Sequence, residues 1–137
     1  MRGPEGQLSK APLVAIVEDD DFFRASVGRL MRSLGYPVEA FPSAADFLAS
    51  RHLDRTACLI ADIQMPGMTG IELYARLIEA GRKIPTILVT AYPDEATRAR
   101  ALKDGIVGYL LKPFDDNDLV DCVRKAVEGG KPPAEHS

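Results

Sequence analysis

The chain has 137 residues, of which 46% are hydrophobic and 27% charged, and its formal net charge is −3. This size predicts one globular domain, and the acidic balance argues against direct binding of nucleic acid by this chain. No apolar run approaches the roughly 18 residues that a membrane-spanning helix needs, and the first residues lack the hydrophobic segment of a secretory signal. We therefore expect a cytoplasmic protein without membrane contact, in which Cys58 and Cys122 are small buried hydrophobic residues rather than a disulfide.

Short apolar runs alternate with helical patterns along residues 12–128, which is typical of βαβ units and a parallel sheet. The expected strands are the runs 13–17, 38–41, 58–62, 87–90 and 109–111. Right-handed crossovers would place helices on both faces of the sheet, giving one α/β domain. Residues 1–11 and 129–137 are rich in Gly, Pro and charge and predict flexible tails, the second of which could begin an interdomain linker.

Helical spacing of apolar residues predicts one helix after each strand. The predicted apolar positions are Phe23, Val27, Leu30, Met31 and Leu34; Phe47 and Leu48; Ile71, Tyr74, Leu77 and Ile78; Ala96, Ala99, Ala101 and Leu102; and Leu119, Val123 and Val127. Expected first residues or caps are Ser43, Thr69 or Gly70, Asp94, and Asp115 or Asp116, and expected stops are Gly35 and Gly81. The fourth helix offers mostly alanines to the core, so we expect it to be the least firmly anchored element.

Polar residues stand where the strands stop. Glu18 and Asp19 follow the first strand, Asp62 ends the third, Thr90 ends the fourth and Lys112 follows the fifth. In a parallel sheet these ends share the carboxyl edge, where open α/β sheets bind ligands. Three carboxylates gathered there would repel one another unless a cation lay among them, and oxygen ligands favour Mg²⁺ over zinc. The bland alternative for the acidic run 19–21, helix capping, carries about equal weight.

Lys112 favours a phosphate-binding interpretation of this edge. A strand-end lysine is usually a solvated charge, but Pro113 could fix the loop, through a cis bond or otherwise, and aim the ammonium inward. Such an ammonium is a point charge for a phosphate oxygen. Thr90 is a core strand residue by default, although its hydroxyl could donate to the same phosphate. Asp62 is then a candidate carboxylate nucleophile that forms an acyl phosphate.

At this point the residues resemble a known family, the receiver domains of two-component response regulators, over about residues 12–128. The matching motifs are Ile16–Asp20 (IVEDD), Asp62–Gly70 (DIQMPGMTG), Val89–Ala91 (VTA) and Gly108–Phe114 (GYLLKPF). Each is weak alone, but four in order at the expected spacing are highly specific. The resemblance implies a flavodoxin-like (βα)5 domain with strand order 2-1-3-4-5. It also implies a signalling switch, which is not an enzyme in the usual sense.

The resemblance assigns roles to individual residues. It implies that Asp62 accepts a phosphoryl group from a sensor histidine kinase or a phosphotransfer protein. The implied Mg²⁺ ligands are Asp19, Asp62 and the backbone carbonyl of Gln64, with Glu18 acting through water. Lys112 and Thr90 would hold the phosphoryl oxygens.

The family also implies a switch and a loop of fixed geometry. Thr90 and Tyr109 would move together on phosphorylation, which biases a bistable element, although packing is the default role of a lone strand aromatic. Pro66, Gly70 and Pro113 would shape the loops of the site. Gln64 and Tyr92 occupy positions that tune phosphoryl lifetime in the family. Val107–Gly108 lacks an acidic residue that one branch uses for dimer salt bridges, so dimerisation of that kind is in doubt, while a homodimer on phosphorylation stays open.

Other functions fit the sequence less well. A haloacid-dehalogenase-type phosphatase also uses a strand-ending aspartate and Mg²⁺, but it needs a second Asp where this chain has Gln64. A nucleotide or flavin module would need a glycine-rich phosphate loop after the first strand, where this chain is acidic. Within the family, the chain could act on a downstream protein or belong to a longer DNA-binding regulator. Its closest resemblance is to receivers that often precede a LuxR-type helix-turn-helix output.

Overall fold

The computed structural model describes residues 11–129, so nearly all of both predicted tails lies outside the described residues. Within that range one parallel sheet holds five strands in the order β2-β1-β3-β4-β5, which confirms the predicted order. The strands are β1 (Leu13–Val17), β2 (Val38–Phe41), β3 (Thr56–Asp62), β4 (Thr86–Thr90) and β5 (Gly108–Leu111). The helices are α2 (Asp21–Ser33), α3 (Ala44–Leu48), the short 3-10 helix η1 (Leu53–Arg55), α4 (Gly70–Glu79), α5 (Glu95–Asp104) and α6 (Asp116–Glu128).

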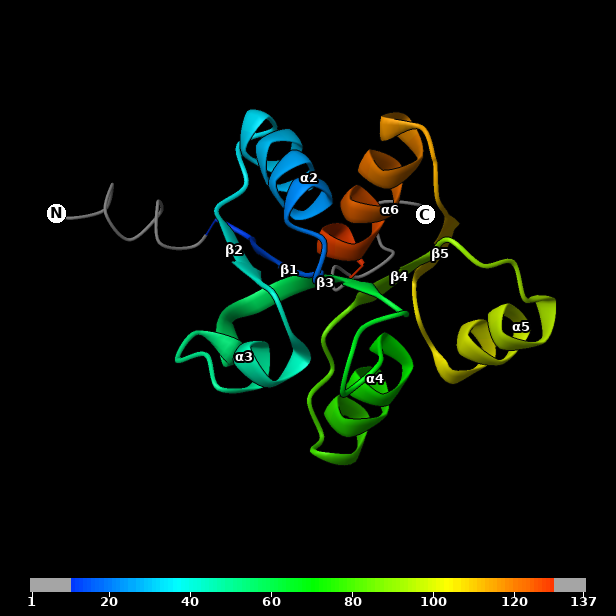
Figure 1. Ribbon diagram of the computed structural model, residues 1–137. Helices are drawn as coiled ribbons and strands as arrows, with labels where there is room; N and C mark the ends of the chain where they lie inside the picture. Colours follow the sequence, from blue (N-terminus) through cyan, green and yellow to red (C-terminus); the bar gives the residue numbers. More distant parts are fainter. Residues whose placement is uncertain (1–10, 130–137) are drawn as a thin grey trace, which may run out of the picture.

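The helices form two layers around the sheet (Figure 1). Helices α2 and α6 cover one face, and α3, α4 and α5 cover the other. The strand residues alternate between the two cores: Val14, Ile16 and Ile60 pack toward α2 and α6, whereas Ala15, Leu59 and Leu88 pack toward α3 and α4. Because both faces are covered, β1 and β4 are buried along their whole length, as expected for a parallel sheet.

Polar side chains fix the first turns of most helices. The Asp20 carboxylate accepts hydrogen bonds from the backbone N–H groups of Phe22 and Phe23 at the start of α2. Thr69 forms a reciprocal capping box with Glu72 at the start of α4, and Asp94 accepts from the N–H of Thr97 at the start of α5. These caps set where each helix begins relative to the strand end before it.

The structure corrects three details of the predicted core. Leu73 is fully buried in α4, while Ile78, which was expected to point inward, is 49% exposed. Leu34 is exposed because the chain has already left α2 and turns at Gly35, whose φ is +93°. Cys58 is buried as expected, but Cys122 is only half-buried, and both thiols are free.

Helix α5 contributes little to the core. Of its residues, all of which the structure describes, Ala101 is the one that is buried, and Leu102 is exposed. Because α5 buries so little apolar surface, the expectation that it is weakly anchored agrees with the structure. Over residues 11–129, the helices are too short and too polar to span a bilayer.

Candidate functional site

The register of the sheet brings four separate strand ends to one edge. Val17 pairs with Ala61, so Glu18 and Asp62 follow side by side at the ends of β1 and β3. Asp62 pairs in turn with Val89, and Thr90 pairs with Leu111, which directly precedes Lys112. The Lys112 backbone N–H donates to the Thr90 carbonyl at 2.7 Å. Residues up to 94 positions apart in sequence are thereby neighbours.

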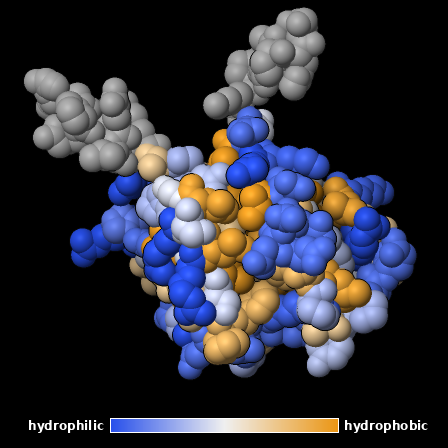
Figure 2. Space-filling view, turned by 90° about the horizontal axis from the view of Figure 1, so that it is seen from above, coloured by the Kyte–Doolittle hydropathy of each residue, from blue (hydrophilic) through white to orange (hydrophobic). Residues whose placement is uncertain are grey.

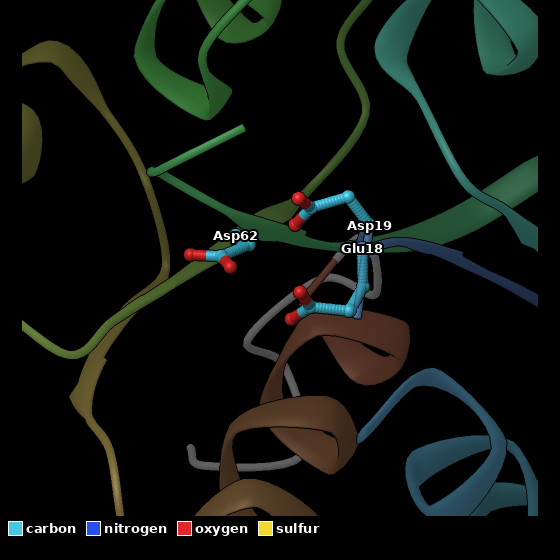
Figure 3. Close-up of side chains that lie close together, drawn as sticks. All are labelled: Glu18, Asp19 and Asp62. Atoms are coloured by element: carbon cyan, nitrogen blue, oxygen red, sulfur yellow. The ribbon is translucent and has the colours of Figure 1, made fainter. Parts of the chain in front are cut away.

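Three carboxylates face a common space at this edge (Figure 3). One oxygen from each of Glu18, Asp19 and Asp62 lies within 4.8 Å of the others. Glu18 and Asp62 are only 1% and 5% exposed, whereas Asp19 is open to solvent. Burial raises the pKa of Glu18 to about 7, and the nearby Asp62 adds to this rise. Hydrogen bonds from the Asp20 backbone and from Lys112 act in the opposite direction. An all-oxygen donor set of this kind suits a hard divalent cation.

Lys112 lies between two of the carboxylates. Its ammonium donates to Glu18 Oε1 at 3.0 Å and to Asp62 Oδ2 at 3.2 Å. Burial alone would lower the pKa of Lys112, but its hydrogen bonds and attraction to Glu18 and Asp62 raise it overall. The ammonium is therefore held in its charged form and directed inward. The peptide bond between Lys112 and Pro113 is cis.

Thr90 is fully buried and its hydroxyl has two close partners. The hydroxyl donates to the Gln64 side-chain oxygen at 2.7 Å and accepts the backbone N–H of Tyr92 at 3.1 Å. Gln64 and Tyr92 thus meet on the same hydroxyl. Sequence analysis picked out both positions, but nothing in the sequence indicated that their atoms converge on Thr90.

The loop between β3 and α4 is shaped by close backbone packing. A Cβ on Gly70 would lie 2.5 Å from the Asp62 carbonyl oxygen, so this position requires glycine. The Gly70 N–H donates to the Ile63 carbonyl, and the Gln64 N–H donates to Asp62 Oδ1 at 3.1 Å. Met65 is buried, whereas Pro66 is exposed within the bend. The predicted ligand role of the Gln64 carbonyl stays a prediction.

Sequence reasoning missed one residue that ties this site together. The Arg24 guanidinium donates to the Glu18 backbone carbonyl at 2.7 Å and to Asp21 at 2.6 Å. It thereby braces the turn between β1 and α2 that carries the acidic residues. A basic residue one turn into a helix is too common for its sequence position to signal such a role.

Tyr109, the expected switch residue, lies on β5 next to the site. It is half-buried and packs against the core beneath α4 and α5. It also lines a pocket of about 350 Å³ with Asp94, Arg98 and Leu111. Burial and the nearby Asp94 raise the pKa of its phenol. The ring thus stands at the border between core and solvent.

Comparison with known proteins agrees with this geometry. Residues 14–124 match the family model described as the response regulator receiver domain. This chain belongs to that family. The receiver domain is 39% identical over 127 residues to nodulation protein W of Bradyrhizobium diazoefficiens, covering 93% of this chain and 56% of that protein. It is 37% identical over 115 residues to the transcriptional regulatory protein FixJ of Azorhizobium caulinodans, covering 83% and 54%.

A solved structure has the same fold. The response regulator StyR superposes with a TM-score of 0.82 at 36% identity, covering 92% of this chain and 62% of that one. The flavodoxin-like fold predicted for the receiver domain is therefore confirmed. The chain spans little more than half the length of the two curated relatives named above. The matched segment is one part of those longer proteins, so it does not define the function of the whole protein.

Proposed function

We propose that this receiver domain is a Mg²⁺-dependent phosphorylation switch in which Asp62 accepts the phosphoryl group. One observation carries the proposal: the Asp62 carboxylate is almost fully buried, belongs to a cluster of three carboxylates with Glu18 and Asp19, and accepts a hydrogen bond from the Lys112 ammonium. A carboxylate is a competent nucleophile for phosphoryl transfer when its surroundings neutralise the incoming charge. Membership of the receiver family supports the same assignment.

The reaction that we propose is an in-line displacement at phosphorus. An Asp62 oxygen forms a bond to the phosphorus atom while the bond from phosphorus to the histidine nitrogen of a sensor kinase or phosphotransfer protein breaks. The products are an acyl phosphate on Asp62 and a free histidine on the donor. Lys112 moves one hydrogen bond from a carboxylate to a phosphoryl oxygen, and the Thr90 hydroxyl leaves Gln64 to donate to another.

The site fits a bound Mg²⁺. The ligands that we propose are Asp19, Asp62 and the Gln64 carbonyl, with Glu18 acting through water. The ion would neutralise the charge that develops on the phosphoryl oxygens. The carboxylate spacing and the raised pKa of Glu18 support this assignment, because a buried carboxylate that is reluctant to ionise gains from a nearby cation.

The test is the intact mass of the protein after incubation with acetyl phosphate, with and without Mg²⁺. We expect one added phosphoryl group on the wild-type protein, dependent on the metal and absent from Asp62→Asn. Because asparagine has nearly the same shape, the circular dichroism spectrum of that variant should be unchanged. An equal adduct on Asp62→Asn would overturn the assignment. So would a wild-type protein that gains no mass and gives no Mg²⁺-dependent NMR response to beryllofluoride, which mimics a phosphoryl group.

The output would be control of a downstream protein or of an attached domain. Two relatives are named as transcriptional regulatory proteins and are about twice as long as the matched segment, so an attached DNA-binding domain is the second candidate. The sequence of the gene beyond the codon for Ser137 distinguishes the two. In either case we propose a cytoplasmic signalling role, in which the catalytic groups serve the domain's own phosphorylation and dephosphorylation.

A further inference from the structure

Lys112 has a third neighbour besides the two carboxylates. Its ammonium nitrogen lies 4.2 Å from the centroid of the Phe23 ring, well inside the range of a cation–π contact. An ammonium has three N–H donors, and Glu18 and Asp62 use two of them. The aromatic face therefore covers a side of the charge that the carboxylates leave free.

The Phe23 ring is itself held in place from two directions. Its backbone lies in the first turn of α2, where the Asp20 carboxylate accepts the Phe23 N–H. Its ring forms a T-shaped pair with the ring of Phe114, at a centroid distance of 5.9 Å and an interplanar angle of 90°. Phe114 follows Lys112 by two residues, so the same loop that carries the ammonium also supports the ring.

These two rings help to line a groove of about 330 Å³ between α2 and α6. Hydrophobic residues gather in the middle of this face, between hydrophilic margins (Figure 2). Phe22, the neighbour of Phe23, is instead 79% exposed. Phe22 and Phe23 are adjacent in the first turn of α2 but differ in exposure. A substitution of Phe22 is therefore a control for the same substitution of Phe23.

We propose that Phe23 is a positioning residue that holds the Lys112 ammonium at the phosphoryl site, an inference that rests on the proposed function of Asp62. When a phosphoryl group arrives, Lys112 exchanges a carboxylate partner for a phosphoryl oxygen. The ring face stays in contact with the ammonium through this exchange and limits the positions that the flexible stem can reach. Less of the lysine's freedom is then lost at the moment of reaction.

A purely structural role for Phe23 is the competing explanation, because its ring also packs against the core under α2 and α6. The two roles differ in what a change of side chain should do. Core packing depends on the volume and apolar area of the side chain, whereas positioning depends on an aromatic face. Phe23→Leu keeps an apolar side chain and removes the π-system, while Phe23→Tyr keeps the ring.

The first measurement is NMR of the resting protein, which needs no phosphorylation. In the wild-type protein the ring current of Phe23 should shift the ε-methylene protons of Lys112 upfield, with the signal assigned by its loss in Lys112→Arg. The shift should disappear in Phe23→Leu and persist in Phe23→Tyr and in the control Phe22→Leu. An unchanged Lys112 signal in Phe23→Leu would overturn the contact.

The second measurement is the rate of phosphorylation by acetyl phosphate in Mg²⁺. We expect Phe23→Leu to be slower than wild type by about fivefold, and Phe23→Tyr and Phe22→Leu to stay within about twofold. Equal rates in wild type and Phe23→Leu would overturn the positioning role. A slow Phe23→Tyr would do the same, since it would show that packing matters and the aromatic face does not. A wild-type protein that gains no phosphoryl group and gives no Mg²⁺-dependent NMR response to beryllofluoride refutes the proposed function instead and leaves the NMR result to decide on the contact.

Discussion

Glu18, Asp62 and Lys112 share a small and largely buried volume, and their charges do not balance. Two buried carboxylates and the exposed Asp19 face a single ammonium. Burial raises the pKa of Glu18 to about 7, and the carboxylates raise the pKa of Lys112. Such a residual negative charge is costly in the resting domain. It is also what would draw a divalent cation to this edge of the sheet.

Gly70 gives a prediction at a single position. Since a Cβ there would lie 2.5 Å from the Asp62 carbonyl oxygen, Gly70→Ala should push the start of α4 away from the end of β3. We expect it to lower the free energy of unfolding by about 2 kcal/mol. It should also slow phosphorylation, because the displaced backbone carries Asp62. Urea unfolding and the acetyl phosphate reaction measure the two effects.

Gly28→Ala is the matched control for this change. Gly28 is also a buried helical glycine, but its added Cβ would meet the end of the flexible Arg32 side chain at 3.3 Å. That side chain can move, and alanine favours a helix over glycine by about 1 kcal/mol. Gly28→Ala should therefore be neutral or stabilising. Equal destabilisation by both substitutions would contradict the steric explanation.

Residues at strand ends could be predicted from the sequence because the chain pattern itself marks them. Glu18, Asp62, Thr90 and Lys112 each follow an apolar run, and a parallel sheet must bring such ends together. Three contacts could not be predicted from the sequence: the hydrogen bond from the Thr90 hydroxyl to Gln64, the hydrogen bond from Arg24 to the Glu18 carbonyl, and the contact of Lys112 with the Phe23 ring. These contacts depend on where side chains in loops and first helical turns point. The spacing of hydrophobic residues along the sequence does not indicate those directions.

At the scale of elements, α4 shows how a helix phase can be misjudged. The predicted apolar positions are Ile71, Tyr74, Leu77 and Ile78. The buried positions are Gly70, Leu73 and Leu77. Gly70 packs closely against the Asp62 backbone, and Leu73 and Leu77, three and seven residues later, share its buried face, whereas Ile78 does not. A glycine that packs tightly is invisible to a pattern based on hydrophobicity. Its position in the loop motif was the one available signal.

Helices α4 and α5 allow a direct comparison of anchoring, since each has ten residues. Helix α4 buries two leucines, each worth about 1.5–3 kcal/mol, whereas α5 buries Ala101. We expect backbone amides in α5 to exchange with solvent through local opening at least about tenfold faster than those in α4. Hydrogen exchange followed by NMR measures both helices in one sample. Equal protection would show that α5 is held by something other than burial.

At the scale of the whole molecule, the layered architecture could be predicted because three rules agree. Apolar runs buried on both faces require a parallel sheet, right-handed crossovers divide the helices between two faces, and the strand ends then meet at one edge. The site therefore draws on β1, β3, β4 and β5 at once, and a ligand bound there connects elements that are distant in sequence. Its effect on stability should be felt by the entire domain.

The last prediction concerns Mg²⁺ and pH together. In the metal-free domain the folded state retains the Glu18 proton up to about pH 7, while the unfolded chain releases it near pH 4.5. Between these values the folded state binds more protons, so this group's contribution to stability decreases as pH rises. Mg²⁺ favours the ionised carboxylate and should bind more tightly as pH rises through 7. At 100 times its dissociation constant the ion adds about 2.7 kcal/mol.

Thermal unfolding with Mg²⁺ or with EDTA measures this increment. We expect a clear rise in Tm with Mg²⁺ at pH 8 and a much smaller one at pH 5.5. Asp19→Asn removes an exposed carboxylate that we propose as a ligand, without disturbing the buried pair of Glu18 and Lys112, so it should abolish the increment while raising the metal-free Tm slightly. An increment that is equal at both pH values, or that survives in Asp19→Asn, would mean that the ion binds elsewhere. The proposal that Mg²⁺ binding, protonation of Glu18 and stability of the domain are coupled at this edge of the sheet would then be wrong.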